Sequence, residues 1–392
     1  MEPHSEIPRI SQDPTDPAFA ADPYPFYARL HAMRSPVFWE EFGVPVIVSW
    51  AAISGALRDR RLGRNDPRAE AEPGAFGRHA ARSMLGRDGQ AHLRVRAPVA
   101  RYFSTARVRQ AGSLAEEIAD EGLRRLAPAG AGDLVSAFCL PTPMRVIARL
   151  IGADGVSPDD LWRWARALTE PYRMLPAPPG ATSEANAATE ESAAFFRGLL
   201  DARAKAPQRD LVSVLAAELD REEAIATLTL VLYAGHRGVA HTIAVAARAL
   251  AGRPDLAEAL SPERVADTVE EALRFDPPAH MFQRIALEDF EGFGLRLRKG
   301  DRVGVLLGAA CRDPARFEEP GRFLIDRANP GHSAFGCGPH FCNGAAIARA
   351  EIAAVLPRLF ARLPGLRITR PPEFANRYPF RAISRLDAAW EA

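Results

Sequence analysis

The sequence predicts a single domain that is mostly α with a minor β part, an α+β fold. Apolar residues at helical spacing dominate the chain from Gln90 to about Leu250, and a further strong helix begins near Asn343. Strand-like segments lie on both sides of this helical body, before residue 50 and between residues 295 and 307. No internal repeat and no linker divides the 392 residues, so the two or three domains that length alone suggests become one.

The N-terminal segment predicts an arm that leads into the domain. Residues 1–22 are polar and rich in proline, and we expect them to be extended, with the domain itself at residues 23–392. Residues 24–33 have helical spacing, and Pro36 ends that helix.

A β-hairpin and a long loop follow. Residues 37–39 and 45–48 are apolar and flank Gly43, which is typical of two strands joined by a turn. Residues 60–89 are rich in glycine, proline and charge, so we expect a long loop, and long loops inside compact domains are often functional.

The helical body is divided by Pro- and Gly-containing breaks at residues 128–130, 152–155 and 176–180. Its longest helix is expected from about Arg221 to Gly252, roughly 45 Å, so that it must cross the domain. A helix over 261–275 and short strands at 295–297 and 302–307 come next. The last helix carries a buried stripe at i, i+3 and i+4 spacing, formed by Ile352, Val355, Leu356, Leu359, Phe360 and Leu363.

Composition excludes several classes of protein. The hydrophobic fraction of 47% argues against a disordered chain, and the net charge of +1 argues against a nucleic-acid binder. Four cysteines are too few for a disulfide scaffold of this size, and no run of about 18 apolar residues predicts a membrane span. We expect a cytoplasmic protein without a membrane anchor, and a monomer.

The stretch from Phe335 to Gly344 predicts a metal-ligand loop. Gly336 and Gly338 allow unusual backbone angles, and Cys342 directly precedes an Ala-rich helix, where the helix dipole favours a thiolate. Gly344 lets a bulky group approach. No second Cys or His has zinc spacing with Cys342, and a single thiolate suits haem iron.

These residues resemble the haem-thiolate signature of the cytochrome P450 family. The pattern Phe335-Gly-x-Gly-x-His340-x-Cys342-x-Gly344, followed by Ala348-Arg349-x-Glu351, matches it densely. The resemblance implies the cytochrome P450 fold, a triangular prism in one domain, and an oxidoreductase with haem b. It also implies that Cys342 is the axial ligand of the iron and that the loop residues Phe335, Gly336, His340 and Gly344 cradle the haem.

Two further segments carry the same resemblance. Glu271 and Arg274 stand at i, i+3 before Phe275-Asp276-Pro277-Pro278, and Arg322 lies in a stretch that matches the family's meander. The resemblance implies that Glu271, Arg274 and Arg322 form a buried charge-paired cluster with a structural role. It implies as well that the haem propionates are bound by His92, Arg96, Arg284 and His340.

The long helix departs from the family pattern. The family has Ala-Gly-x-acid-Thr here, where the Ala-Gly pair leaves room above the iron and the acid and alcohol relay protons. Ala234 and Gly235 are kept, but Arg237 replaces the acid and Gly238 replaces the threonine.

Three explanations of this departure remain open. The enzyme could be a monooxygenase whose protons come from ordered water or from the substrate. It could be a peroxygenase that uses hydrogen peroxide, with Arg237 pairing a substrate carboxylate. It could also bind haem without activating O2, as an isomerase, a dehydratase or a binding scaffold.

The resemblance also places the substrate and the partners. The pocket is expected to be largely apolar and to hold a small organic substrate. The residues expected to contact that substrate are Tyr233, Arg237, His280, Met281, Phe282 and Phe380. Electrons would come from a separate ferredoxin and its reductase, because no reductase domain is fused to the chain.

Overall fold

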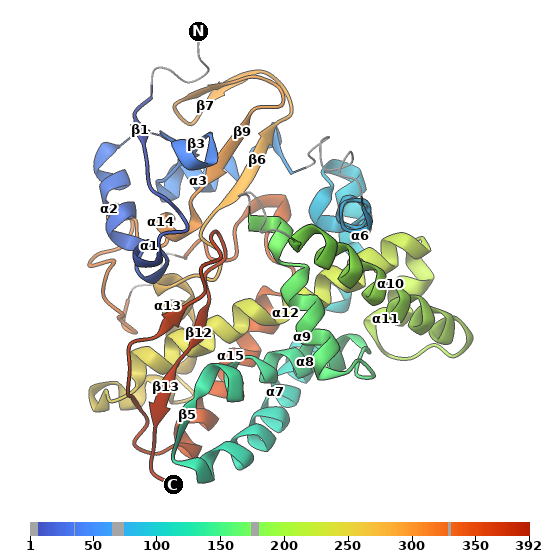
Figure 1. Ribbon diagram of the computed structural model, residues 1–392, viewed down its shortest axis with the longest axis vertical. Coiled ribbons are helices and arrows are strands. Elements are labelled where there is room, and N and C mark those ends of the chain that lie inside the picture. Colours follow the sequence, from blue (N-terminus) through green and yellow to red (C-terminus); the bar gives the residue numbers. More distant parts are fainter. Residues whose placement is uncertain (1–6, 35, 65–73, 174–179, 328–330) are drawn as a thin grey trace.

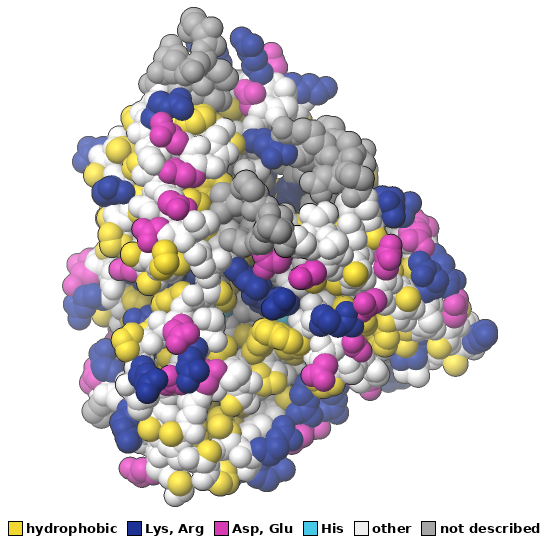
Figure 2. All heavy atoms as spheres, in the orientation of Figure 1, with side chains coloured by type: hydrophobic (Ala, Val, Ile, Leu, Met, Phe, Trp, Pro, Cys, Tyr) yellow, Lys and Arg dark blue, Asp and Glu magenta, His cyan; other side chains and the backbone are white. Residues whose placement is uncertain are grey.

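The computed structural model describes residues 7–34, 36–64, 74–173, 180–327 and 331–392 (Figure 1). These residues form a mostly helical molecule with small sheets, which confirms the predicted fold class. Figure 2 shows a roughly triangular outline, with acidic and basic side chains interspersed over the visible face. No helix among the described residues is long and apolar enough to cross a bilayer.

The helices of the described residues are α1 Pro17–Ala21, α2 Tyr24–Met33, α3 Trp50–Ala56, α5 Ala75–Arg82, α6 Gly89–Tyr102, α7 Thr105–Leu126, α8 Pro141–Ile151, α9 Pro158–Ala167, α10 Ala181–Lys205, α11 Leu211–Glu218, α12 Arg221–Leu250, α13 Val265–Phe275, α14 Leu307–Ala310 and α15 Ala345–Arg362. The strands are β1 Arg9–Ile10, β2 Val37–Trp39, β3 Val44–Ile47, β4 Leu62–Gly63, β5 Ala131–Asp133, β6 Phe282–Ala286, β7 Phe290–Gly292, β8 Leu295–Leu297, β9 Arg302–Val305, β10 Arg367–Ile368, β11 Glu373–Phe374, β12 Ile383–Arg385 and β13 Asp387–Ala389.

The largest sheet joins N-terminal strands to two strands from residues 282–305. Its strand order is β1-β2-β3-β9-β6-β4. The predicted hairpin is confirmed, since β2 and β3 pair antiparallel with Val37 opposite Val46, and β3 then pairs parallel with β9. A Cβ on Gly304 would lie 2.8 Å from Val46 Cγ1, so these two strands pack too closely for a side chain there. Strands that are about 240 residues apart in the sequence therefore share one core.

Two N-terminal segments differ from the prediction. The described part of residues 1–22 is not an extended arm, because β1 pairs with β2 and α1 buries Phe19 against Phe26 and Trp39, with ring centroids 5.6 and 6.0 Å away. Residues 60–89 are not a plain loop either, because they contain β4 and α5; residues 65–73 lie outside the described residues. In the first case, burial of an aromatic side chain outweighs the polar, proline-rich composition.

The long helix α12 crosses the molecule, as Figure 1 shows. Its N-terminus is capped by the Asp220 side chain, which accepts a hydrogen bond from the Glu223 backbone N–H at 3.0 Å. It packs against α8 on one side and against α13 and α15 on another. The stripe predicted on α15 is confirmed, because Ile352, Val355 and Leu356 are fully buried. The packing of α12 beside α15 defines where the site lies.

Candidate functional site

The loop before α15 turns on two glycines. Gly336 and Gly338 have φ angles of 68° and 72°, in the left-handed region that favours glycine. A Cβ at Gly338 would lie 2.1 Å from the Leu57 carbonyl oxygen, so no other residue fits there. The Cys342 backbone N–H donates to the Phe335 carbonyl at 3.0 Å and closes the loop. The loop thereby holds Cys342 at the start of α15.

Cys342, at the start of α15, and Ala234, on α12, are both accessible, and these two helices pack together. The Cys342 side chain is exposed, yet the protein around it is dense enough that burial raises the pKa of its thiol, against the opposing effects of the Gly344 N–H and the Arg96 charge. Ala234, in the buried middle of α12, is exposed as well. A Cβ on Gly344 would meet no atom within 4 Å. A metal bound at Cys342 would take the thiolate form of the cysteine.

Cationic and imidazole side chains gather around this loop. The rings of His92 and His340 have centroids 4.2 Å apart, and His340 Nε2 lies 2.9 Å from Asp88 Oδ1. His92 Nε2 is buried and has no hydrogen-bond partner among the described residues. Arg96 Nη2 donates to the Phe341 carbonyl at 2.6 Å. Three of the four residues predicted to bind propionates, His92, Arg96 and His340, are thus close together, and Arg284 lies near them.

Arg284 is a buried cation that lacks an acidic partner. Its side chain lies on β6 and the residue is 3% exposed, and in the described part of the chain it forms no ion pair and donates only to the neighbouring Gln283 carbonyl, at 2.9 Å. Burial and the nearby Arg64 charge lower its pKa to about 9. A buried guanidinium is costly without an anion. Two propionate carboxylates would satisfy Arg284 and the open nitrogen of His92, so the residues present fit a haem.

Sequence reasoning missed Arg64 and Asp88. Arg64 follows β4, donates from its backbone N–H to Asp88 Oδ2 at 2.7 Å and from Nε to the Leu85 carbonyl at 3.2 Å. Its guanidinium lies 5.3 Å from the centre of the Phe282 ring, and burial lowers its pKa. No motif marks these two residues, and their position in a charged, glycine-rich segment carries no signal of its own.

The residues of the Ala-Gly-x-Arg-Gly segment of α12 contact different parts of the protein. A Cβ on Gly235 would lie 2.5 Å from Ile147 Cγ1, so the space left by this glycine is occupied by α8. A Cβ on Gly238 would meet Pro278 Cγ at 3.3 Å. The Thr242 hydroxyl donates to the Gly238 carbonyl at 2.8 Å, which ties it to its own helix. Ala234 is therefore the small residue of this segment that remains exposed.

Arg237 is half-buried beside an ion pair. Glu170, in the short 3₁₀ turn Glu170–Arg173, lies 3.0 Å from Arg377 through its Oε1. Burial and the Arg377 charge lower the pKa of Arg237 to about 10, and Glu170 acts in the other direction. Arg237 itself forms no hydrogen bond or ion pair with any other described residue.

Of the predicted substrate contacts, Tyr233, Phe282 and Phe380 remain partly accessible. Tyr233 on α12 stacks on Tyr172, with ring centroids 6.1 Å apart. Phe380 follows a cis Tyr378–Pro379 bond and bridges to Ala279.

Two predicted contacts lie in the core instead. His280 is 1% exposed, and its Nδ1 is hydrogen-bonded to the Tyr27 hydroxyl at 2.8 Å. Met281 is fully buried, and a Cβ on Gly304 would approach its Sδ to 3.0 Å. The structure contradicts the prediction for both, because their side chains are enclosed in the core, His280 against Tyr27 and Met281 close to Gly304.

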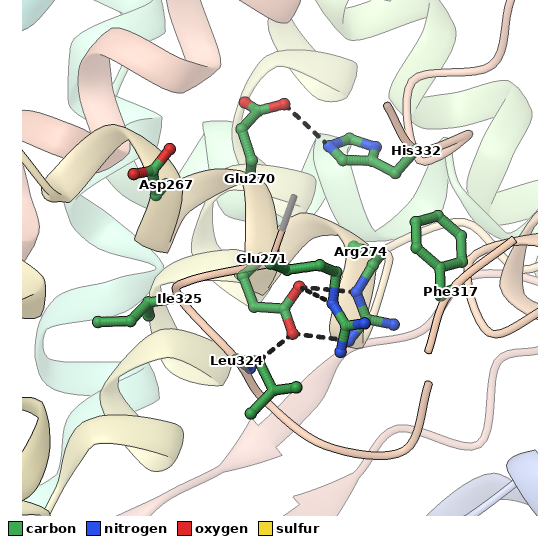
Figure 3. A pocket seen from close by; sticks show the side chains of 9 residues that line it. Asp267, Glu270, Glu271, Arg274, Phe317, Leu324, Ile325 and His332 are labelled. Atoms are coloured by element: carbon green, nitrogen blue, oxygen red, sulfur yellow. Dashed lines mark hydrogen bonds and ion pairs between the residues drawn. The ribbon is translucent and has the colours of Figure 1, made fainter. Parts of the chain in front are cut away.

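Figure 3 shows the pair of Glu271 and Arg274 in the charge-paired cluster on α13, whose third arginine is Arg327 and not the predicted Arg322. Arg274 binds both carboxylate oxygens of Glu271 at 2.7 Å. Arg327 Nε lies 3.3 Å from Glu271 Oε2, whereas the exposed Arg322 side chain pairs with Glu319 at 2.7 Å. The prediction for Arg322 was wrong for its side chain, and only its backbone carbonyl accepts a bond from Arg274, at 3.1 Å.

Comparison with known proteins agrees with this geometry. A family model described as Cytochrome P450 matches residues 181–364. "Cytochrome P450 107B1" of Saccharopolyspora erythraea is 33% identical over 91% of this chain and 92% of its own length, and "Cytochrome P450 monooxygenase PikC" of Streptomyces venezuelae is 32% identical over 95% and 92%. The crystal structure of P450BioI with an acyl carrier protein that carries hexadec-9Z-enoic acid superposes with a TM-score of 0.89, at 27% identity, over 96% of this chain and all of that one. The chain therefore belongs to the cytochrome P450 family, as a monooxygenase that takes haem b as its cofactor.

Proposed function

We propose that this enzyme hydroxylates, or otherwise monooxygenates, a small and largely apolar organic substrate. The observation that carries the proposal is that Cys342 lies just before α15, which packs against α12, and stands beside a cluster of cations that includes the buried Arg284, which forms no ion pair with a described residue. Haem b bound there supplies the chemistry of oxygen activation. The residues that would hold it are Cys342 at the iron, Phe335, Gly336 and Gly344 around the loop, and His92, Arg96, Arg284 and His340 at the propionates.

The chain's own residues support an unusual proton supply. Arg237 stays charged at neutral pH and so is a poor proton donor, and Gly238 has no hydroxyl group. Thr242 is one turn further along and donates to its own helix. Protons would therefore come from ordered water or from a polar group of the substrate.

The haem itself is tested by the absorption spectrum of the reduced protein with carbon monoxide. We expect the band of a thiolate-ligated haem, and Cys342→Ala should abolish it. Cys337→Ala is the matched control, because this cysteine lies in the same loop with its Sγ bonded to the Ser54 carbonyl at 3.7 Å. Loss of the band in the Cys337 variant but not in the Cys342 variant would contradict the assignment.

The oxidant decides between monooxygenase and peroxygenase. We expect faster product formation with a ferredoxin, its reductase and O2 than with hydrogen peroxide. The second candidate, a peroxygenase in which Arg237 pairs a substrate carboxylate, is favoured by the absence of an ion pair at Arg237 among the described residues. Turnover that is faster with peroxide would establish that alternative.

Arg237 has its own test. If Arg237 binds an anionic substrate group, Arg237→Ala should weaken the binding of carboxylic acids about tenfold or more, the value of a charged hydrogen bond of about 1.5–3 kcal/mol. The affinity for neutral ligands should not change. The haem spectral shift measures both affinities. Arg237→Lys should keep part of the preference. Equal weakening for acids and for neutral ligands would show that Arg237 acts only in packing.

A further inference from the structure

A small cavity next to Tyr233 carries several unsatisfied polar groups. Its empty space of about 220 Å³ includes volume that is open to solvent, and it lies between α5, the end of α9 with the following turn, and α12. Apolar and aromatic side chains form most of its wall, including Phe76, Leu168 and Tyr172. Phe76 and Tyr172 meet edge to face, with ring centroids 5.4 Å apart.

Three side chains of this wall have buried polar atoms without a hydrogen-bond partner in the described part of the chain. They are His79 Nε2, Thr229 Oγ1 and Tyr233 Oη, although the Tyr233 hydroxyl has the Tyr172 hydroxyl as a neighbour that interacts with it. Thr229 is 1% exposed, and it stands at i, i+4 to Tyr233 on one face of α12. His79 reaches the same wall from α5, which packs against α12. A buried polar group without a hydrogen-bond partner destabilises the folded protein, so three such groups around one cavity indicate that a polar ligand binds there.

These groups are suited to a neutral partner. Burial lowers the pKa of His79 to about 4, so its ring is neutral at pH 7. Burial also raises the pKa of Tyr233, which keeps the phenol protonated. A hydroxyl group donates one hydrogen bond and accepts two, which matches three partners that can each donate or accept.

We propose that this cavity is a subsite for a hydroxyl group of the substrate, bound by His79, Thr229 and Tyr233. The inference rests on the proposed function, because it concerns the substrate of that reaction. It narrows the substrate class to molecules that are apolar at the oxidised end and carry a hydroxyl group at another.

The test uses haem-loaded enzyme and three ligands with one carbon skeleton, namely butylbenzene, 4-phenylbutan-1-ol and 4-phenylbutanoic acid. Binding is measured by calorimetry and by the haem spectral shift. We expect the alcohol to bind at least tenfold more tightly than the hydrocarbon. Thr229→Val and Tyr233→Phe should each reduce that ratio about 3- to 10-fold, the value of one hydrogen bond, while Thr229→Ser should keep it.

Thr227→Val is the matched control. Thr227 is fully buried on the same helix and its hydroxyl is also unpartnered among the described residues, but it does not line the cavity. Its replacement should leave the ratio unchanged. The carbon-monoxide band of each variant reports folding and haem binding separately, so that loss of this band in the parent enzyme contradicts the proposed function rather than the subsite.

Three results would overturn the subsite. Equal binding of the alcohol and the hydrocarbon, or binding of neither, would mean that the cavity holds water alone. A preference for the acid that disappears in Arg64→Ala would assign recognition to that buried guanidinium instead, because Arg64 lies near Tyr172 and Tyr233. A ratio that falls equally in the Thr227 variant would show a general effect on α12.

Discussion

At the scale of single residues, Glu351 is a carboxyl group with no evident partner. It lies on α15, is 1% exposed, and its Oε1 has no hydrogen-bond partner among the described residues. Burial raises its pKa to about 8, so the folded protein holds this side chain protonated at neutral pH. The unfolded chain would release that proton from pH 4.5 upwards.

This difference predicts stability that depends on pH. The contribution of Glu351 is fully present below pH 4.5 and is lost as the pH rises toward 8. Glu351→Gln removes the proton release, so it should stabilise the protein relative to wild type by roughly 3 kcal/mol at pH 7, and hardly at all at pH 4.5. Urea unfolding at both pH values measures this.

Glu190→Gln serves as the control, because Glu190 is exposed on α10. It should change the free energy of unfolding little at either pH. A constant difference between wild type and Glu351→Gln across the pH range would contradict the raised pKa of Glu351.

At the scale of elements, Gly235 of α12 can be explained either by space above the iron or by the packing of a neighbouring helix. The pattern places Gly235 in the segment that the family uses above the iron, but its missing side chain accommodates Ile147 of α8. Gly198, in the middle of α10, is exposed and would meet nothing with a Cβ. The same substitution should therefore have opposite effects in these two helices.

Gly198→Ala should stabilise the protein by about 0.5–1 kcal/mol, because alanine has the higher helix propensity. Gly235→Ala should destabilise it by about 1–3 kcal/mol through overpacking, and Ile147→Val in the same chain should recover part of that loss. Thermal unfolding of the four proteins distinguishes the cases. If Gly235→Ala stabilised the protein instead, α8 would be able to shift and accommodate the added methyl group without a loss of free energy.

The cluster on α13 gives a second prediction at this scale. Arg327→Ala should cost about 1.5–3 kcal/mol, the value of a hydrogen bond to a charged group, since it removes one partner of the buried Glu271 while Arg274 still pairs both carboxylate oxygens. Arg322→Ala should cost less than 1 kcal/mol, because its pair with Glu319 is exposed. Chemical unfolding measures both, and equal losses would restore the original assignment of Arg322.

At the scale of the whole molecule, Asp276 connects segments from both ends of the chain. Its Oδ1 accepts hydrogen bonds from the Tyr24 hydroxyl at 2.7 Å and from Arg381 Nε at 2.6 Å, and its carbonyl oxygen lies 2.9 Å from His241 Nε2 on α12. Burial opposes the ionisation of Asp276, but the Arg381 charge and the hydrogen bond with His280 outweigh it, so the pKa lies well below 3.8.

Asp276 should therefore stabilise the protein above pH 3.8, with its contribution lost as the pH falls below that value. Asp276→Asn should cost about 3–5 kcal/mol at pH 7, as for a broken buried pair, and should raise the pH at which acid unfolds the protein. Asp255→Asn, which breaks an exposed pair with Arg253, is the control. An unchanged acid midpoint in the Asp276 variant would contradict this role.

The sequence by itself determined the features that depend on neighbouring residues. The loop around Cys342 is one, because its glycine angles and the following helix lie within ten residues of each other. The α12 helix, the hairpin and the breaks at Gly130 and Gly152 follow from local periodicity and from backbone preference in the same way.

Only the tertiary structure decided which distant side chains meet. Arg64 and Asp88 join the cationic cluster, and Arg327 takes the place expected for Arg322, because chain packing brings separate segments together. The tertiary structure also decided which neighbours a residue faces, since Met281 faces the core and Gly235 faces α8. Spacing along the chain identifies a residue's element, but what its side chain touches depends on neighbours that are far away in the sequence.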